Sequence, residues 1–231
     1  MASKEETRAS HRARRAALTP EALATAGAGI AKYGVAWAAR LAGGRSGTFA
    51  AYLGVGSEPP SLPLLAALHQ EGHRLLLPVC EPGLELSWVY WTPASRFVRS
   101  RYAPIQEPAG ERHDASVMRC ADGIFLPATA VDYSGNRIGQ GGGYYDKFLA
   151  KLAAVQHSGT STSDGGLLPP VPAAAVVYDG EVLPCRKHPG GVLRPESGCR
   201  TDPVRRGAAA APGCRGPVAG VIELALRPCD C

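Results

Sequence analysis

The chain has 231 residues, of which 45% are hydrophobic, and this length fits one α/β domain or one domain with extensions. No apolar run approaches the roughly 18 residues that a membrane-spanning helix needs, and the polar start of the chain, residues 1–6, is unlike a signal peptide. The net charge of +5 arises mainly in residues 185–231, so the nearly neutral remainder gives no indication of nucleic-acid binding. We therefore expect a cytoplasmic protein without a membrane or nucleic-acid partner.

Two helices are predicted at the start of the chain. Residues 3–17 favour a helix on which Lys4, Arg8, His11 and Arg15 share one face, and such a basic face is either solvated or functional. Residues 19–21 then read Thr-Pro-Glu, which is a helix start with an N-cap, a proline and an acid in the first turn. The second helix should run to about residue 41.

The next segment predicts a β-α-β unit. Residues 47–53 favour a strand, 54–60 a loop, 62–70 a helix and 73–78 a second strand, which together indicate a parallel sheet. Ligands gather where such strands end in loops. Glu58 lies in one of these loops and is either an ordinary solvated glutamate or a site residue. Residues 85–91 favour a further strand, whose Trp88, Tyr90 and Trp91 form either a stacking wall for a flat heterocycle or part of the core.

A glycine-rich turn follows the predicted strand at residues 121–127. The run GQGGGYYD covers residues 139–146, and apolar residues from Tyr145 to Val155 then recur at helical spacing. Such a turn lets the backbone approach a ligand closely, and its N–H groups in front of a helix suit a phosphate, with Arg137 adding positive charge. The alternative is a plain strand-to-helix connection. The run fits neither the dinucleotide fingerprint, because Tyr144 replaces its last glycine, nor the P-loop, which requires G-K-[ST].

Residues 132–149, DYSGNRIGQGGGYYDKFL, resemble the signature of the 5-formyltetrahydrofolate cyclo-ligase (5,10-methenyltetrahydrofolate synthetase) family. The spacing of Lys4, Arg8 and Thr19 also matches the family, as does the interval from Leu53 to Glu58. The matching segments extend from Lys4 to Pro184. The resemblance therefore implies a single family-like domain over residues 1–184.

The resemblance implies a fold and an activity. The fold would be an α/β three-layer sandwich in which helices flank a mainly parallel sheet. The activity would be the ATP- and Mg²⁺-dependent cyclisation of 5-formyltetrahydrofolate to 5,10-methenyltetrahydrofolate, with release of ADP and phosphate, by an enzyme that we expect to be a monomer. Two alternatives stay open: a relative that binds folate or nucleotide without turnover, and a phosphate-binding module with another partner.

The resemblance also assigns roles to residues. Arg137 and Tyr145 would be catalytic, and Asp146 would bind Mg²⁺. The substrate would contact Leu53, Glu58, Gln140, Gly141, Gly142, Gly143 and Tyr144. ATP would contact Lys4, Arg8, Arg137, Ile138, Gly139, Gln140, Gly141, Gly142, Gly143, Tyr144 and Tyr145.

The family pattern breaks after residue 184. Pro189 stands where the family has a second metal-binding aspartate, and residues 185–231 contain six prolines, seven glycines and no aromatic residue. This composition is typical of disorder, and a frameshift would explain it together with the arginines and cysteines. We expect deletion of residues 190–231 to cost little stability. The alternative is that the apolar run at residues 218–226, VAGVIELAL, docks on the core as a terminal strand or helix.

Overall fold

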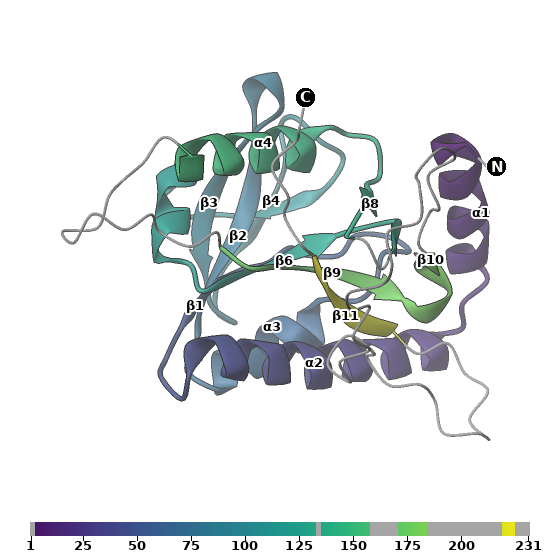
Figure 1. The fold of residues 1–231 in the computed structure, drawn as a ribbon, viewed down its shortest axis with the longest axis horizontal. Coiled ribbons are helices and arrows are strands. Elements are labelled where there is room, and N and C mark those ends of the chain that lie inside the picture. The colour runs from purple at the N-terminus through teal and green to yellow at the C-terminus, as the bar shows by residue number, and fades with distance from the viewer. Residues whose placement is uncertain (1–2, 133–134, 158–170, 184–218, 225–231) are drawn as a thin grey trace, which may run out of the picture.

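A six-stranded sheet with helices on both faces forms the centre of the protein (Figure 1). The computed structural model describes residues 3–132, 135–157, 171–183 and 219–224. In spatial order the strands are β11 (Ala219–Leu224), β9 (Ala173–Tyr178), β6 (Gly123–Pro127), β1 (Thr48–Ala50), β2 (Arg74–Glu81) and β3 (Glu85–Trp91). The four inner strands are parallel, and β11 and β3 pair antiparallel at the two edges. The mainly parallel α/β sheet predicted from the sequence is confirmed.

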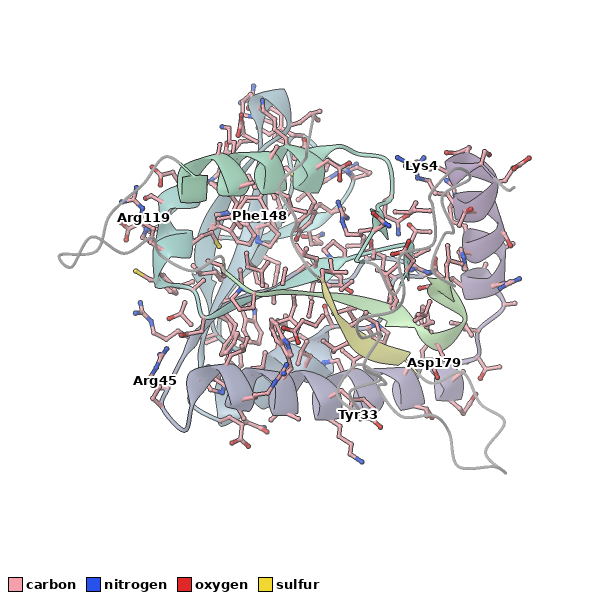
Figure 2. All side chains as sticks on the ribbon, viewed as in Figure 1. Lys4, Tyr33, Arg45, Arg119, Phe148 and Asp179 are labelled. Carbon is pink, nitrogen blue, oxygen red and sulfur yellow. The ribbon has the colours of Figure 1, made fainter. Side chains whose placement is uncertain are left out.

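The helices make the sheet the middle of three layers. Helices α2 (Pro20–Ala42) and α3 (Leu62–Gln70) cover one face, and α4 (Tyr144–His157) covers the other (Figure 1). On the α2 side, Trp37 packs edge-on against Phe125 of β6, with 4.8 Å between ring centroids. On the α4 side, Phe148 points toward the sheet and lies 5.0 Å from the Trp88 ring (Figure 2). Two apolar cores, one on each face, therefore hold the layers together.

Local signals set the helix starts. Helix α1 (Lys4–Ala16) begins with a capping box in which Ser3 and Glu6 each accept a hydrogen bond from the other's backbone N–H. At the start of α2, the Thr19 side chain accepts from the N–H of Ala22 over 3.2 Å. This helix ends at Gly43, whose φ of 59° is the left-handed conformation that glycine adopts without strain. The predicted boundaries of these helices agree with the structure to within about two residues.

Among the described residues, five short strands lie outside the central sheet. They are β4 (Phe97–Arg99), β5 (Gln106–Pro108), β7 (Ala130–Asp132), β8 (Arg137–Ile138) and β10 (Val182–Leu183). Strands β4 and β5 form an antiparallel ribbon, and β10, β7 and β8 form a three-stranded sheet that carries the chain into the glycine-rich turn. The sequence predicted neither small sheet, because strands of two or three residues leave almost no periodic pattern.

The tryptophans of β3 belong to the core. Trp88 is fully buried and Trp91 is 4% exposed, and Trp88 pairs with Phe148. The structure therefore confirms that the tryptophans of this strand are part of the core and do not form a stacking wall for a ligand.

The expectation of a tail without structure is wrong for residues 219–224. Strand β11 pairs with all six residues of β9, from Ala219 opposite Tyr178 to Leu224 opposite Ala173. Val221 packs on the α2 face of the sheet and Ile222 on the α4 face. The glycine and proline content of residues 185–231 is an average over a long segment, and it says nothing about six residues that pair with β9. The alternative of a terminal strand is therefore confirmed for residues 219–224. Pro189 and the proposed frameshift lie outside the described residues.

Candidate active site

A cavity of about 530 Å³ opens where the parallel strands of the central sheet end. Its walls come from the loop after β1, the carboxyl half of β2, the turn between β2 and β3, the end of β6, the ribbon of β4 and β5, and the glycine-rich turn before α4. A cavity of this size at this edge of a sheet is the usual position of a ligand site in an α/β protein.

The glycine-rich turn, residues 139–143, forms one wall of the cavity. Gly141 and Gly143 have φ values of 103° and 79°, which L-residues with side chains rarely adopt. In the part of the chain that the structure describes, no hydrogen bond is donated by the N–H groups of residues 139–143. These amides precede the first turn of α4, whose own N–H groups add to a partial positive charge. The turn is thus built to receive an anion.

Three cations surround this turn. Arg8 of α1 donates from Nε to the carbonyl of Gly139 over 2.9 Å, which fixes α1 against the turn. Lys4 lies one helical turn before Arg8, and Figure 2 shows it on the side of α1 that faces the turn. Arg137 precedes the turn, and its side chain is 8% exposed.

Arg137 and Asp146 form an ion pair across the turn. Arg137 also donates from Nη1 to the carbonyl of Pro127 over 2.9 Å, so its guanidinium is held from two sides. Burial lowers the pKa of Arg137, and the Asp146 carboxylate partly offsets this shift. Asp146 itself is 74% exposed on the first turn of α4 and lines the cavity.

Glu58 faces the glycine-rich turn from the opposite wall. Its carboxylate accepts from the N–H of Val55 over 3.0 Å and from Nε2 of Gln140 over 3.2 Å. Burial raises the pKa of Glu58 above its ordinary value. A partly desolvated carboxylate in a cavity wall favours a ligand that presents N–H donors to it.

Two tyrosines connect the turn to the rest of the cavity. Tyr144 donates from its hydroxyl to the carbonyl of Tyr102 over 3.3 Å. Tyr145 places its ring 6.0 Å from the Arg137 guanidinium, and its buried hydroxyl has no hydrogen-bond partner among the described residues. Burial raises the pKa of Tyr145 far above its ordinary value, so this hydroxyl stays protonated.

A buried ion pair anchors α1, and no local sequence pattern indicates it. Arg15 donates from Nε and Nη2 to the Glu181 carboxylate over 2.6 and 2.8 Å, and from Nη2 to the carbonyl of Ala128 over 2.7 Å. Both side chains are nearly inaccessible to solvent. The basic face of α1 is therefore buried at Arg15 and contacts the glycine-rich turn at Arg8, and the Arg15–Glu181 pair positions the helix that carries Lys4 and Arg8.

Most of the predicted site residues meet in this cavity. Its lining includes Leu53, Glu58, Arg137, Gly139, Gln140, Gly141, Gly142, Gly143, Tyr144, Tyr145 and Asp146. Arg8 reaches the outer side of the turn, and Ile138 pairs with Ala130 in the small sheet without lining the cavity. The sequence pattern does not indicate Tyr52, Cys80, Leu84 or residues 102–106, which line the remaining walls. Next to them, the Glu107 carboxylate accepts from the N–H of Cys80 over 2.7 Å.

A sequence model of the 5-formyltetrahydrofolate cyclo-ligase family matches residues 1–185. The chain belongs to this family. The match ends close to the point where the sequence departs from the family pattern.

Individual relatives agree with this assignment. The chain is 38% identical over 131 residues to the 5-formyltetrahydrofolate cyclo-ligase of Mycolicibacterium smegmatis, covering 54% of this chain and 66% of that protein. It is 34% identical over 104 residues to the Escherichia coli K12 protein of the same name, covering 44% of this chain and 57% of that one. The match thus spans less than two thirds of either relative. The fold is similar to that of the 5,10-methenyltetrahydrofolate synthetase of Aquifex aeolicus, with a TM-score of 0.55 and 23% identity over 82% of this chain and 85% of that chain.

The exposed Asp146 carboxylate at the edge of the cavity could bind a hard cation. Among the described residues no three His, Cys, Asp or Glu side chains gather as a metal centre. A cation here would take the exposed Asp146 carboxylate and complete its shell with phosphate oxygens and water. Mg²⁺ binds in this manner, so the site fits the Mg²⁺ that the family resemblance implies.

Proposed function

We propose that the protein catalyses the ATP- and Mg²⁺-dependent cyclisation of 5-formyltetrahydrofolate to 5,10-methenyltetrahydrofolate, with release of ADP and phosphate. One observation carries this proposal. The five unpaired amides of residues 139–143 lie between Arg8 and Arg137 on one side of a cavity whose other side holds the Glu58 carboxylate. Such a cavity can hold a polyphosphate and an N–H-rich heterocycle together.

The reaction requires both ligands in contact. The formyl oxygen attacks the γ-phosphorus of ATP, the bond to the bridging oxygen breaks, and ADP leaves. N10 of the folate then attacks the activated formyl carbon and loses its proton to the departing phosphate or to water, and phosphate departs with the former formyl oxygen. Phosphoryl transfer of this kind depends on positioning and charge stabilisation rather than on covalent help from the protein.

Each site residue has a part in this scheme. Lys4, Arg8 and Arg137, with the amides of the turn, hold the phosphates. Asp146 holds Mg²⁺, which supplies positive charge at the phosphate oxygens. Tyr144 and Tyr145 line the junction between nucleotide and folate, and Leu53 and Glu58 hold the pterin ring, whose paired N–H groups match a carboxylate.

Helix α1, which carries Lys4 and Arg8, is held in place by two long-range contacts. Because the Arg15–Glu181 pair and the Arg8–Gly139 hydrogen bond hold α1 in place, Arg8 needs little reorganisation to meet a phosphate. In the described part of the chain no helix is long and apolar enough to cross a membrane. We place the protein in the cytoplasm, as a monomer that acts without nucleic acid.

A second candidate rests on Pro189. This residue stands where the family has a second metal-binding aspartate, so the protein could bind folate and nucleotide without turnover. One measurement distinguishes the two candidate functions, because only an active enzyme consumes ATP in proportion to the folate that it converts.

The test is formation of 5,10-methenyltetrahydrofolate, followed by absorbance, together with release of ADP. We expect one ADP for each product molecule, and no product when ATP is omitted or the cation is chelated. Gly141→Ala should reduce turnover, because a side chain at φ of 103° strains the turn. The matched control is Gly44→Ala, which imposes similar strain at φ of 83° outside the cavity. Folate binding with no ADP release would instead support the second candidate.

A further inference from the structure

Two exposed apolar side chains line the cavity and have no part in the proposed scheme. Among the described residues four large apolar side chains are exposed, and two of these, Leu84 at 46% and Tyr102 at 42%, lie in the cavity wall. Leu84 is in the turn between β2 and β3, and Tyr102 is in the loop that joins β4 to β5. Because apolar side chains are stabilised when they leave water, these two positions favour an apolar part of the ligand.

The backbone of Leu84 is strained. Its φ of 62° lies in the left-handed region, and in the described part of the chain no other residue with a side chain is found there. The turn is tied to α4 on both sides of this residue, because Lys147 donates from Nζ to the carbonyl of Gly83 over 2.8 Å and pairs with Glu85 over 2.7 Å. Strain of this kind persists only where the surrounding structure enforces it, and it is concentrated at ligand sites. The fold therefore holds the Leu84 side chain at the cavity although leucine disfavours the conformation.

Leu84 and Tyr102 both contact the end of the glycine-rich turn. The Cδ1 atom of Leu84 lies 3.1 Å from the position that a Cβ atom on Gly143 would occupy. The hydroxyl of Tyr144 donates to the backbone carbonyl of Tyr102 over 3.3 Å, so this hydrogen bond positions the loop without engaging the Tyr102 ring. The exposed apolar surface of the cavity wall therefore lies beside the junction of the turn with α4.

The contacts of the turn change in character along its length. At its start, the carbonyl of Gly139 accepts from Arg8 of α1. Gln140 follows and donates to the Glu58 carboxylate. Figure 1 shows α1 at the opposite end of the molecule from β3, the strand that follows the turn carrying Leu84. A polyphosphate therefore belongs at the cationic start of the glycine-rich turn and an N–H-rich ring beside Glu58, which leaves the end of the turn for an uncharged, apolar group.

We propose that Leu84 and Tyr102 are positioning residues for the folate, which pack against its aminobenzoyl ring. The inference rests on the proposed function for the identity of the ligand. The aminobenzoyl ring is the flat, uncharged group that follows the pteridine, and its contacts with an aliphatic and an aromatic side chain are of the kind that hold such rings in proteins. Its nitrogen is N10, the atom that closes the new ring, so a fixed aminobenzoyl ring also restricts where N10 can lie.

The test compares Leu84→Asn and Tyr102→Ala with wild type in calorimetric titrations. With 5-formyltetrahydrofolate and no ATP, the Kd of each variant should rise about 4- to 15-fold, because apolar contact with the ring is lost. The Kd for ATP without folate should stay as in wild type. In saturation-transfer NMR, the benzoyl protons of the folate should lose intensity relative to the pteridine protons. Without ligand, the thermal midpoint of Leu84→Asn should equal or exceed that of wild type, because asparagine adopts the left-handed conformation more readily than leucine.

Leu62→Asn is the matched control for Leu84→Asn. Leu62 is 53% exposed at the start of α3, does not line the cavity and has an ordinary φ. The control variant should bind folate and ATP as wild type does, and its thermal midpoint should not rise.

Three results would overturn the inference while the proposed function stands. The first is an active wild type whose two variants bind folate with unchanged Kd. The second is a rise in the Kd for ATP equal to that for folate, which would assign the apolar surface to the adenine ring. The third is a Leu84→Asn midpoint that falls together with the affinity, which would show that Leu84 supports the turn and not the ligand. A wild type that binds no folate would instead overturn the proposed function itself, and this inference with it.

Discussion

Arg8 donates from Nε to the backbone carbonyl of Gly139 over 2.9 Å, across 131 residues of sequence. This hydrogen bond holds the first helix of the chain against the glycine-rich turn. The Nη1 atom of the same guanidinium binds Glu5 over 3.0 Å, so Arg8 is oriented before any ligand arrives. The phosphate site that we propose therefore depends on how α1 is attached to the domain.

Lys4→Ala tests the contribution of α1 to nucleotide binding. We expect the apparent KM for ATP to rise roughly 10- to 100-fold, the effect of losing one charged hydrogen bond of about 1.5–3 kcal/mol, with a smaller change for the folate. Steady-state kinetics with each substrate varied in turn will measure this. The control is Arg12→Ala, which removes an exposed cation of α1 that pairs with Glu5. If Lys4→Ala and Arg12→Ala raise the KM for ATP equally, Lys4 is only part of a solvated basic face.

Asp146→Asn tests the proposed metal ligand. We expect turnover to fall by orders of magnitude, because a neutral amide is a poor ligand for Mg²⁺ and leaves the charge of Arg137 without its partner. The Asp146 side chain is 74% exposed, so the fold should persist, which circular dichroism will show. Asp114→Asn is the control, since Asp114 caps a short helix outside the cavity and asparagine also caps well. Wild-type turnover of Asp146→Asn at limiting Mg²⁺ would refute the assignment.

Glu58→Gln tests whether the ionised carboxylate in the cavity wall lowers the free energy of unfolding. Burial raises the pKa of Glu58 above its ordinary value of 4.5, so the folded protein binds this proton more tightly than the unfolded chain does. Ionisation of Glu58 therefore lowers the free energy of unfolding of wild type. This destabilisation increases as pH rises from 4.5 through the pKa of Glu58 in the folded protein. The free energy of unfolding of Glu58→Gln, relative to wild type, should rise over this window and then level off, while folate affinity falls. Urea titrations across the pH range will measure it, and a difference that declines with pH would contradict the raised pKa.

Arg15→Met should destabilise the protein more than the loss of any exposed ion pair. It leaves the buried carboxylate of Glu181 without its cation: the N–H of Tyr178 still donates to it over 3.1 Å, but His11 lies 3.9 Å away and burial lowers the pKa of that histidine. Breaking a buried pair in this way costs about 3–5 kcal/mol. The double variant Arg15→Met, Glu181→Leu should recover much of the loss in urea unfolding, and Arg40→Ala, which breaks an exposed pair with Glu223, serves as control. If Arg15→Met and Arg40→Ala lower the free energy of unfolding equally, the buried pair does not anchor α1.

Deletion of residues 219–231 should lower the thermal midpoint strongly, in contrast to what the tail composition predicted. The deletion removes Val221, Ile222 and Leu224 from the two cores and leaves the β9 edge unpaired. Each of these side chains contributes about 1.5–3 kcal/mol when buried. Deletion of residues 225–231 retains β11 and is the matched control for calorimetry. Equal midpoints for the two truncated proteins would show that β11 adds nothing to stability.

Features that depend only on neighbouring residues could be predicted from the sequence. The glycine-rich turn is one, because its φ values, its amides and the helix behind it all arise within about ten residues of chain. The start of α2 at Thr19 is another, since capping requires only the next three residues. The parallel sheet followed from the order of strands and helices, and the family signature then indicated the ligands.

Tertiary structure decided which of these residues meet. The contact between Gln140 and Glu58 joins positions 82 apart, and the Arg15–Glu181 pair joins positions 166 apart, so neither leaves a local pattern. Whether Arg15 lies in solvent or in the core depends on what packs over it, which helical periodicity cannot reveal. Strand β11 stayed an open alternative, a terminal strand or helix, for a related reason. It is buried on both faces, so it reads as a continuous apolar run, and such a run becomes a strand only when β9 supplies its hydrogen-bond partners.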